Sequence, residues 1–141
     1  MREILDVTVG TLMSQPAVTV GPETSIEALT ELMATHGYNA FPVVDGAGVL
    51  QGLVTRLDLF KLYLLPYRRF IAALEDTWIA SVAGIMGRGA VALTPTDSAI
   101  KAIALMVEYR LRTIPIVTPT ATGAVVVGVV TRRDLVAALK P

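Results

Sequence analysis

GLVTRLD at residues 52–58 and GVVTRRD at residues 128–134 are two versions of one heptapeptide, and each follows an apolar run. Outward from this phrase, a shift of 73 residues superposes five landmarks without a gap: Met13 on Met86, Pro22 on Pro95, Ser25 on Ser98, Met33 on Met106 and Pro42 on Pro115. Beyond Pro42 the offset grows to 76, because the turn TPTATGA is longer than DGAG, and a glycine-rich turn tolerates insertions. The sequence therefore predicts two copies of one unit, at about 8–64 and 81–140.

The composition narrows the class of protein. Apolar residues make up 53% of the 141, which is enough for a core, and twelve basic residues balance twelve acidic ones. This balance gives no overall attraction to nucleic acid or to an anionic membrane surface. The chain contains no uninterrupted apolar run of a membrane-spanning length, and MREILDVTVG lacks a signal-peptide core, so we expect a cytoplasmic protein. The mean hydropathy of +0.61 favours apolar surface shared between subunits, and we expect a homodimer.

Each copy has the same predicted secondary structure. A short extended piece (AVTV, AVAL) is followed by a turn that contains proline and then by a helix. The helix has an apolar stripe along one face. The stripe consists of Ile26, Leu29 and Met33 in the first copy and of Ala99, Ala102, Ile103 and Met106 in the second. Thr24 with Glu27 predicts the first helix start as a capping box, and Asp97 predicts the second. Two apolar runs, AFPVVD with VLQGLVT and TIPIVT with AVVVGVVT, predict strands covered on both faces. The last helix of each copy starts after GLVT or GVVT, which gives β-α-β-β-α twice.

A β-α-β-β-α unit with an early methionine, a proline-flanked strand (FPVV, IPIV) and a closing G-h-h-T-x-x-D resembles the cystathionine-β-synthase (CBS) domain, here as a tandem pair. The resemblance implies an α+β fold in which two motifs pack sheet to sheet with pseudo-two-fold symmetry. We expect the first motif at 1–64 and the second at 80–141, and the helical spacing of Phe70, Ile71, Leu74 and Trp78 predicts a linker helix at 65–79. The resemblance also implies two clefts that bind adenine nucleotides (AMP, ADP or ATP) or related adenosyl ligands, and modules that pair into dimers.

The resemblance carries four residues over to this chain: Thr55, Asp58, Thr131 and Asp134. A strand that runs into a helix presents free backbone N–H groups, where a threonine hydroxyl adds a donor for phosphate. An aspartate one turn later is placed to accept hydrogen bonds from ribose hydroxyls. The arginines beside these motifs are predicted to neutralise phosphate: Arg56, Arg132 and Arg133. The predicted adenine-lining residues are Ala17, Val18, Asn39, Ala40, Phe41 and Pro42 in the first copy and Ala90, Val91, Thr113, Ile114 and Pro115 in the second.

Two interpretations of the repeated T-x-x-D remain open. The first is a ligand-sensing module whose occupancy is relayed to an effector protein. The second is a dimerisation or scaffold module without ligand, in which threonine and aspartate only cap the helix. The sequence contains no nucleophile–base pair, metal cluster or phosphate-binding loop of the Walker type, so we expect neither an enzyme, nor a metal site, nor a required cofactor. His36 is expected at a helix C-terminus, and the repeated methionines are expected in the core.

Overall fold

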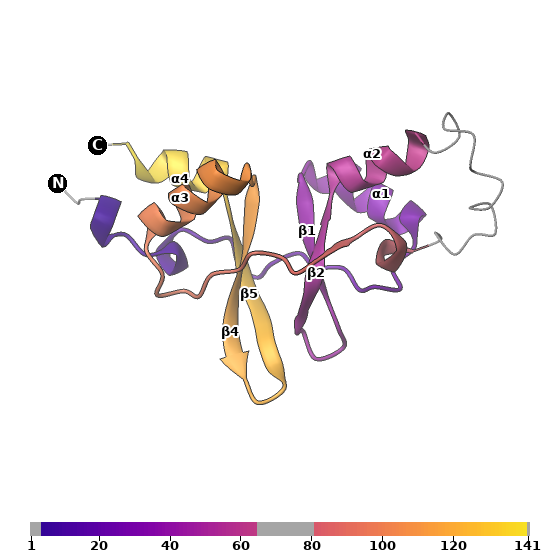
Figure 1. The fold of residues 1–141 in the computed structure, drawn as a ribbon, viewed down its shortest axis with the longest axis horizontal. Coiled ribbons are helices and arrows are strands. Elements are labelled where there is room, and N and C mark those ends of the chain that lie inside the picture. The colour runs from indigo at the N-terminus through magenta and orange to yellow at the C-terminus, as the bar shows by residue number, and fades with distance from the viewer. Residues whose placement is uncertain (1–3, 65–80, 141) are drawn as a thin grey trace. The chain divides into compact units, whose positions relative to one another are not determined.

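The computed structural model describes residues 4–64 and 81–140 and confirms the predicted order of elements in both copies. The first copy contains α1 (Ile26–His36), β1 (Ala40–Val44), β2 (Leu50–Thr55) and α2 (Arg56–Leu64). The second contains α3 (Ala99–Tyr109), β4 (Thr113–Thr120), β5 (Gly123–Thr131) and α4 (Arg132–Ala138) (Figure 1). The predicted first strands are single extended residues, Val20 bridging Val43 and Leu93 bridging Ile116, both in parallel. The fold is therefore α+β and duplicated.

The first helix of each copy starts at a repeated serine, so the predicted caps at Thr24 and Asp97 are wrong. Ser25 Oγ accepts from the N–H of Ala28, and Ser98 Oγ accepts from the N–H of Lys101. Thr24 and Asp97 each stand one residue too early to cap the helix, and they close the preceding turn instead. Thr24 Oγ1 accepts from the N–H of Gly21 at 3.0 Å, and Asp97 Oδ2 accepts from the N–H of Thr94 at 2.8 Å.

The residue that caps the C-terminus of this helix differs between the two copies. Gly37 ends α1 in the left-handed region with φ +66°, where glycine has no steric cost. Arg110 ends α3 at the equivalent position with φ +57°. Among the residues described, Arg110 is the one non-glycine residue with a positive φ, a conformation that costs free energy for a residue with a Cβ.

The proline-containing strands are buried on both faces, as their apolar sequence predicts. Phe41, Val43, Ile114 and Ile116 are inaccessible to solvent, and Pro42 and Pro115 are also fully buried. The core of the second copy also contains Met106 and, from α4, Leu135. Met33 is buried in the first copy, which confirms the expected core position of these two methionines. His36 is the last residue of α1, as expected, and stacks on Tyr38 with ring centroids 5.1 Å apart.

The segment that leads into the first helix of each copy packs against the other copy. Two 3-10 turns near the N-terminus, η1 (Ile4–Asp6) and η2 (Val9–Thr11), lie beside α3, and Val7 and Val9 complete its core (Figure 1). The N–H of Val9 donates to Asp97 O at 2.9 Å. Reciprocally, Val82 of η5 (Val82–Gly84) donates to Thr24 O at 2.8 Å. Each helix start is therefore held by the leading segment of the other copy.

The exchange continues at the sheet edges, where it explains the glycine of the repeated heptapeptide. Ser14 pairs with Val129 of β5, and β3 (Gly87–Arg88) pairs antiparallel with β2 through Gly52 and Leu53. A Cβ on Gly52 would collide with Gly87 O. A Cβ on Gly128 would lie 2.7 Å from Met13 Sδ and 2.8 Å from Ser14 O. The crossing backbone leaves no room for a side chain at either glycine.

As a result, each of the two compact units combines residues from both predicted segments. Unit 1 takes in Met1–Val18, Ala47–Leu50 and Val91–Pro141, and unit 2 takes in Thr19–Gly46 and Gln51–Ala90, so far as these residues are described. The short piece 47–50 joins unit 1 because Val49 bridges Val125 of β5. The predicted linker helix at 65–79 lies outside the described residues.

Gly52→Ala and Gly128→Ala are expected to lower the free energy of unfolding by about 1–3 kcal/mol, the usual cost of overpacking. Gly52→Ala should cost more, because Gly87 O lies closer to its Cβ position than either Met13 Sδ or Ser14 O lies to that of Gly128. Gly46→Ala is the matched control, because nothing lies within 4 Å of its Cβ position. Urea denaturation measures all three, and equal stabilities would contradict the close crossing.

Asp97→Asn is expected to lower stability at neutral pH by about 1 kcal/mol. The hydrogen bond from the Thr94 N–H is the chief cause that lowers the pKa of Asp97 below its ordinary value. Partial burial raises this pKa, and Lys101, whose Nζ lies 3.3 Å from Oδ1, lowers it further. Because the folded-state pKa is depressed, the contribution is present above the unfolded pKa of about 3.9 and is lost as the pH falls through the folded value. The stabilities of wild type and variant should therefore converge in acid. Asp6→Asn, at an exposed position in η1, is the control and should show no such convergence.

Candidate functional site

Each candidate half-site forms where the second hairpin strand runs directly into the last helix of its copy. In unit 2, the N–H of Thr55 donates to Asp58 Oδ2 at 2.8 Å, and the N–H of Asp58 donates to Thr55 Oγ1 at 3.1 Å. This reciprocal pair satisfies backbone donors at the start of α2. The capping function of T-x-x-D is therefore present in the first copy.

The second copy has the same pair of bonds and one more. In unit 1, the N–H of Thr131 donates to Asp134 Oδ2 at 2.8 Å, and the N–H of Asp134 donates to Thr131 Oγ1 at 3.4 Å. The Thr131 hydroxyl also donates to Asp134 Oδ2 at 3.0 Å. The Thr131 proton is thus engaged inside the cap, whereas the Thr55 hydroxyl donates to no group among the described residues. Of these two threonine hydroxyls, that of Thr55 is therefore the one with no acceptor among the described residues.

Both aspartates use only one carboxylate oxygen for the cap. Every hydrogen bond to Asp58 and Asp134 within the described part of the chain ends on Oδ2 or involves the backbone N–H. Both residues are half-buried. Since a carboxylate has about four lone-pair positions, Oδ1 remains able to accept hydrogen bonds from a ligand while the cap is intact.

The first arginine of each motif ties the start of the last helix to the end of the first helix. Arg56 donates from its backbone N–H to Asn39 O at 2.7 Å and from a terminal guanidinium nitrogen to Gly37 O at 3.3 Å. Arg132 donates from its N–H to Arg112 O at 3.2 Å and from Nε to Leu111 O at 2.8 Å. Each guanidinium thus already donates one hydrogen bond to a backbone carbonyl, and its other N–H groups bond no described residue. Arg133 is exposed and bonds no residue of the described chain through its side chain.

The predicted adenine-lining strand residues lie at the same junction, but most of their side chains face the core. Thr113 pairs with Thr131 in the β4–β5 ladder, so strand start and helix start are neighbours. Ala40, Phe41, Pro42, Thr113, Ile114 and Pro115 are buried. Asn39 is half-buried and Arg112 is exposed at the equivalent position, and neither side chain bonds another described residue. These two polar side chains are therefore the accessible part of the predicted wall.

The second predicted wall is divided between the compact units. Ala17 and Val18 belong to unit 1, whereas Thr55 and Asp58 belong to unit 2. Ala90 belongs to unit 2, whereas Val91 shares unit 1 with the Thr131 half-site. All four wall residues are half-buried. Within one unit, the structure brings together threonine, aspartate, arginine and the proline strand.

The described residues contain no group of three or more His, Cys, Asp or Glu side chains that is able to hold a metal ion. Over the same residues, no helix is long and apolar enough to span a membrane. Every buried side-chain nitrogen or oxygen there has a hydrogen-bond partner.

The sequence interpretation assigned no role to Gly52 and Gly128, the first residues of the repeated heptapeptide. They position each half-site, because the strand that carries the threonine passes under a segment from the other copy. The signal was available, since both glycines recur at the offset of 76 that aligns the threonines and aspartates. The serines that cap α1 and α3 were likewise visible as a repeated pair.

Comparison with known proteins assigns the duplicated unit to a family. The CBS domain profile matches twice, at residues 9–65 and 82–141. The chain therefore belongs to the CBS domain family, as a tandem pair of CBS domains. An inosine-5'-monophosphate dehydrogenase from Korarchaeum cryptofilum is 26% identical over 118 residues, or 84% of this chain. The chain spans only 21% of the length of that enzyme.

Solved structures share the fold over nearly the whole chain. CBSX2, known from Arabidopsis thaliana and crystallised with AMP, is 28% identical with a TM-score of 0.79, and the match covers 94% of this chain and 95% of that one. The CBS domain pair of protein MJ0100, crystallised with 5'-methylthioadenosine and S-adenosyl-L-methionine, has a TM-score of 0.75 at 23% identity. That match covers 94% of each chain and bears on the fold alone.

Asp58→Ala and Asp134→Ala are each expected to lower the free energy of unfolding by about 1 kcal/mol, because each loses a reciprocal cap. Arg133→Ala is the matched control beside the same cap, and its effect should stay within about 0.5 kcal/mol. Urea denaturation without ligand measures all three. If both aspartate variants were as stable as the control, the capping bonds would not contribute in solution.

Proposed function

We propose that this chain is a regulatory, non-catalytic module that binds adenine nucleotides or related adenosyl ligands at its two Thr/Asp half-sites. The observation that carries the proposal is that the two carboxylate oxygens of Asp58, and likewise of Asp134, differ in their hydrogen bonding. Oδ2 completes the helix start, and Oδ1 is left without a partner in the described chain. A rigidly held carboxylate with one free oxygen suits the two hydroxyls of a ribose, which both donate hydrogen bonds.

The surrounding side chains support an adenosine ligand with phosphate. The Asn39 amide has both a donor and an acceptor to offer to a base edge. Arg112, at the equivalent position, and Arg133 supply positive charge next to the second half-site, where phosphate oxygens are favoured. CBSX2, with a similar sequence and fold, was crystallised with AMP, which supports the same ligand class here.

A module of this kind regulates only if the ligand distinguishes between two arrangements of the protein. A nucleotide that binds one arrangement of the two units more tightly shifts the population toward it, and an effector protein in the cytoplasm reads the shift. Equal affinity for both arrangements would shift nothing. The sequence contains one histidine and no cysteine, and His36 stacks on Tyr38, which supports a binding role in preference to catalysis.

The competing candidate is a dimerisation scaffold without ligand. The capping bonds of Thr55 with Asp58 and of Thr131 with Asp134 favour it, because they give the repeated motif a sufficient structural reason. Under this alternative, substitution of either aspartate changes stability but no ligand response.

AMP, ADP, ATP and S-adenosylmethionine are expected to raise the melting temperature to different extents. A ligand present at about 100 times its Kd adds about 2.7 kcal/mol, which corresponds to a shift on the order of 10 °C for a chain of this size. The asparagine variants Asp58→Asn and Asp134→Asn retain a side-chain acceptor for the cap but lose the charge. The double variant should therefore remain folded and lose most of the shift.

The double variant Glu31→Gln with Glu108→Gln, at exposed positions in α1 and α3, removes two carboxylate charges as a matched control and should retain the full shift. Differential scanning fluorimetry with isothermal titration calorimetry measures both effects. If none of the four ligands raises the melting temperature of the wild type, or if the double asparagine variant responds like the wild type, the binding proposal fails and the scaffold remains.

A further inference from the structure

The two half-sites differ at the residue that begins the proline-containing strand. Thr113 begins β4 in the second copy, and Ala40 begins β1 in the first. Both residues are 7% exposed, and Thr113 is the one buried polar residue among those described. Since Ala40 starts the same strand in the same frame, the fold does not require a hydroxyl at this position.

The side chain of Thr113 lies on the same face of the sheet as that of Thr131. Side chains alternate between the two faces along a strand, and Ile114 and Ile116 belong to the core that also contains residues of α3 and α4. Thr113 therefore faces the opposite side. Thr113 is also the ladder partner of Thr131, and residues directly opposite each other in an antiparallel pair share a face. The two threonine side chains are therefore neighbours in the second half-site.

The Thr113 hydroxyl bonds no described residue. All fully enclosed side-chain oxygens of the described residues have partners, so this hydroxyl oxygen is not fully enclosed. A largely buried hydroxyl without a partner lowers the stability of the fold, so stability does not explain its presence. The hydroxyl of Thr131 donates to Asp134 Oδ2 at 3.0 Å. Thr113 thus supplies a free hydroxyl donor in the second half-site, as Thr55 does in the first.

Two arginines close to this threonine pair add positive charge. Arg112 directly precedes Thr113, and Arg133 follows Thr131 by two residues. Both arginines are exposed, and neither side chain bonds a described residue. The equivalent residues of the first copy are uncharged, Asn39 and Leu57. The second half-site therefore has two cationic side chains that the first half-site lacks.

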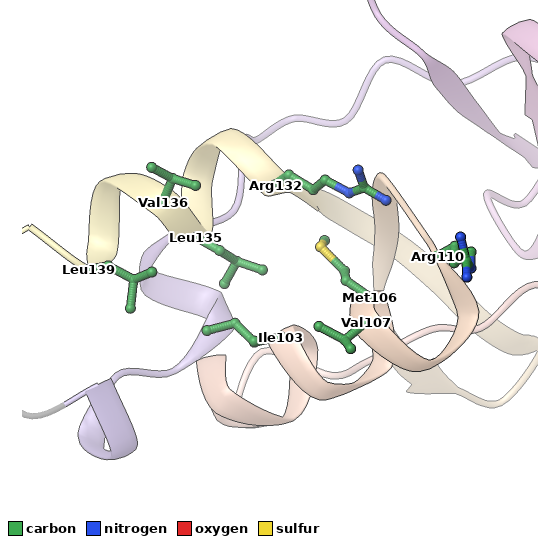
Figure 2. A pocket seen from close by; sticks show the side chains of 8 residues that line it. All are labelled: Ile103, Met106, Val107, Arg110, Arg132, Leu135, Val136 and Leu139. Carbon is green, nitrogen blue, oxygen red and sulfur yellow. The ribbon is translucent and has the colours of Figure 1, made fainter.

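Arg132 makes no contribution to this contrast. Figure 2 shows its side chain at the open groove between α3 and α4, which it lines together with Met106. Arg56 is its equivalent in the first copy, and the guanidinium of each arginine donates to a backbone carbonyl. The charge that distinguishes the half-sites therefore comes from the arginines at 112 and 133.

We propose that Thr113 is a ligand-binding residue of the second half-site, where its hydroxyl donates to a phosphate oxygen and selects a phosphorylated ligand. This inference rests on the proposed function and adds a preference for phosphate at one half-site. Ionised phosphate oxygens accept hydrogen bonds, and the free hydroxyl and the two guanidiniums of Arg112 and Arg133 are all donors. The first half-site has neither arginine, so it binds adenosyl ligands with a weaker dependence on phosphate.

The affinities for AMP and adenosine test this assignment when the first half-site is disabled by Asp58→Asn. In this background, AMP is expected to bind about tenfold more tightly than adenosine. Thr113→Val, which replaces the hydroxyl with a methyl group, should weaken AMP binding about tenfold, the usual effect of losing a charge-assisted hydrogen bond, and leave adenosine binding unchanged. Thr113→Ser keeps the hydroxyl and should retain the affinity for AMP. Thr118→Val, at an exposed position of β4, is the matched control. Isothermal titration calorimetry measures all of these affinities.

The melting temperature without ligand separates a binding role from a structural one. Because the hydroxyl has no partner in the described fold, Thr113→Val should melt at the temperature of the unsubstituted protein or above it. If Thr113→Val melts below Thr113→Ser, the hydroxyl has a partner within the protein and the proposal fails.

Three binding results would overturn the proposal. Equal weakening of AMP and adenosine by Thr113→Val would assign the hydroxyl to the nucleoside. Equal affinities for AMP and adenosine before this substitution would show no selection for phosphate. AMP binding that does not respond to Thr113→Val would remove Thr113 from the site and leave the proposed function intact. If neither compound binds in the Asp58→Asn background, the proposed function fails at this half-site and the assignment of Thr113 fails with it.

Discussion

Two backbones cross at Gly52 and again at Gly128, so closely that a single methyl group has no room at either point. The rest of the structure depends on this constraint. The segment that crosses at Gly128 continues from Val7 and Val9, which complete the core around α3, and the segment that crosses at Gly52 continues from Val82, which bonds the turn before α1. Each copy therefore obtains part of its core from the segment that leads into the first helix of the other copy. Because each copy receives backbone hydrogen bonds from a segment of the other copy, we expect the folding of the two copies to be coupled.

Most of the architecture could be predicted from the sequence because the sequence pattern of the unit occurs twice in the chain. Strand and helix order, the buried stripes of Leu29 with Met33 and of Ala102 with Met106, and the start of α2 and α4 after threonine all follow from local patterns that recur at a fixed offset. Chance similarity does not repeat in register, so repetition confirms each weak local signal. The predicted helix starts failed where two capping residues stand side by side. Thr24 and Ser25 are both good caps, and the choice between them depends on the bond from Gly21, which no local pattern specifies.

The candidate site was predictable in its residues and less so in their surroundings. Threonine and aspartate three residues apart give the cap by local geometry alone. The exchange between copies was not visible, because the partner segments are separated by more than a hundred residues from Ser14 to Val129. Burial of the proline strands also changes the interpretation. Phe41 and Ile114 are held in the core, so their apolar character serves packing, and Asn39 and Arg112 are the polar side chains of this predicted wall that solvent reaches most.

The two copies share their structural residues and differ where side chains reach solvent, and this contrast separates structure from function. Glycine, threonine, arginine and aspartate of the heptapeptide occur in both copies, and each has a packing or capping role in both. Three of the differences lie at or near the half-sites, Asn39 against Arg112, Leu57 against Arg133 and Gly37 against Arg110, and each of these three adds positive charge to the second copy. None of these substitutions is required by the fold, since the first copy forms the same elements without them. Under the proposed function, the extra positive charge beside the second half-site is therefore expected to give the two half-sites unequal preference for anions.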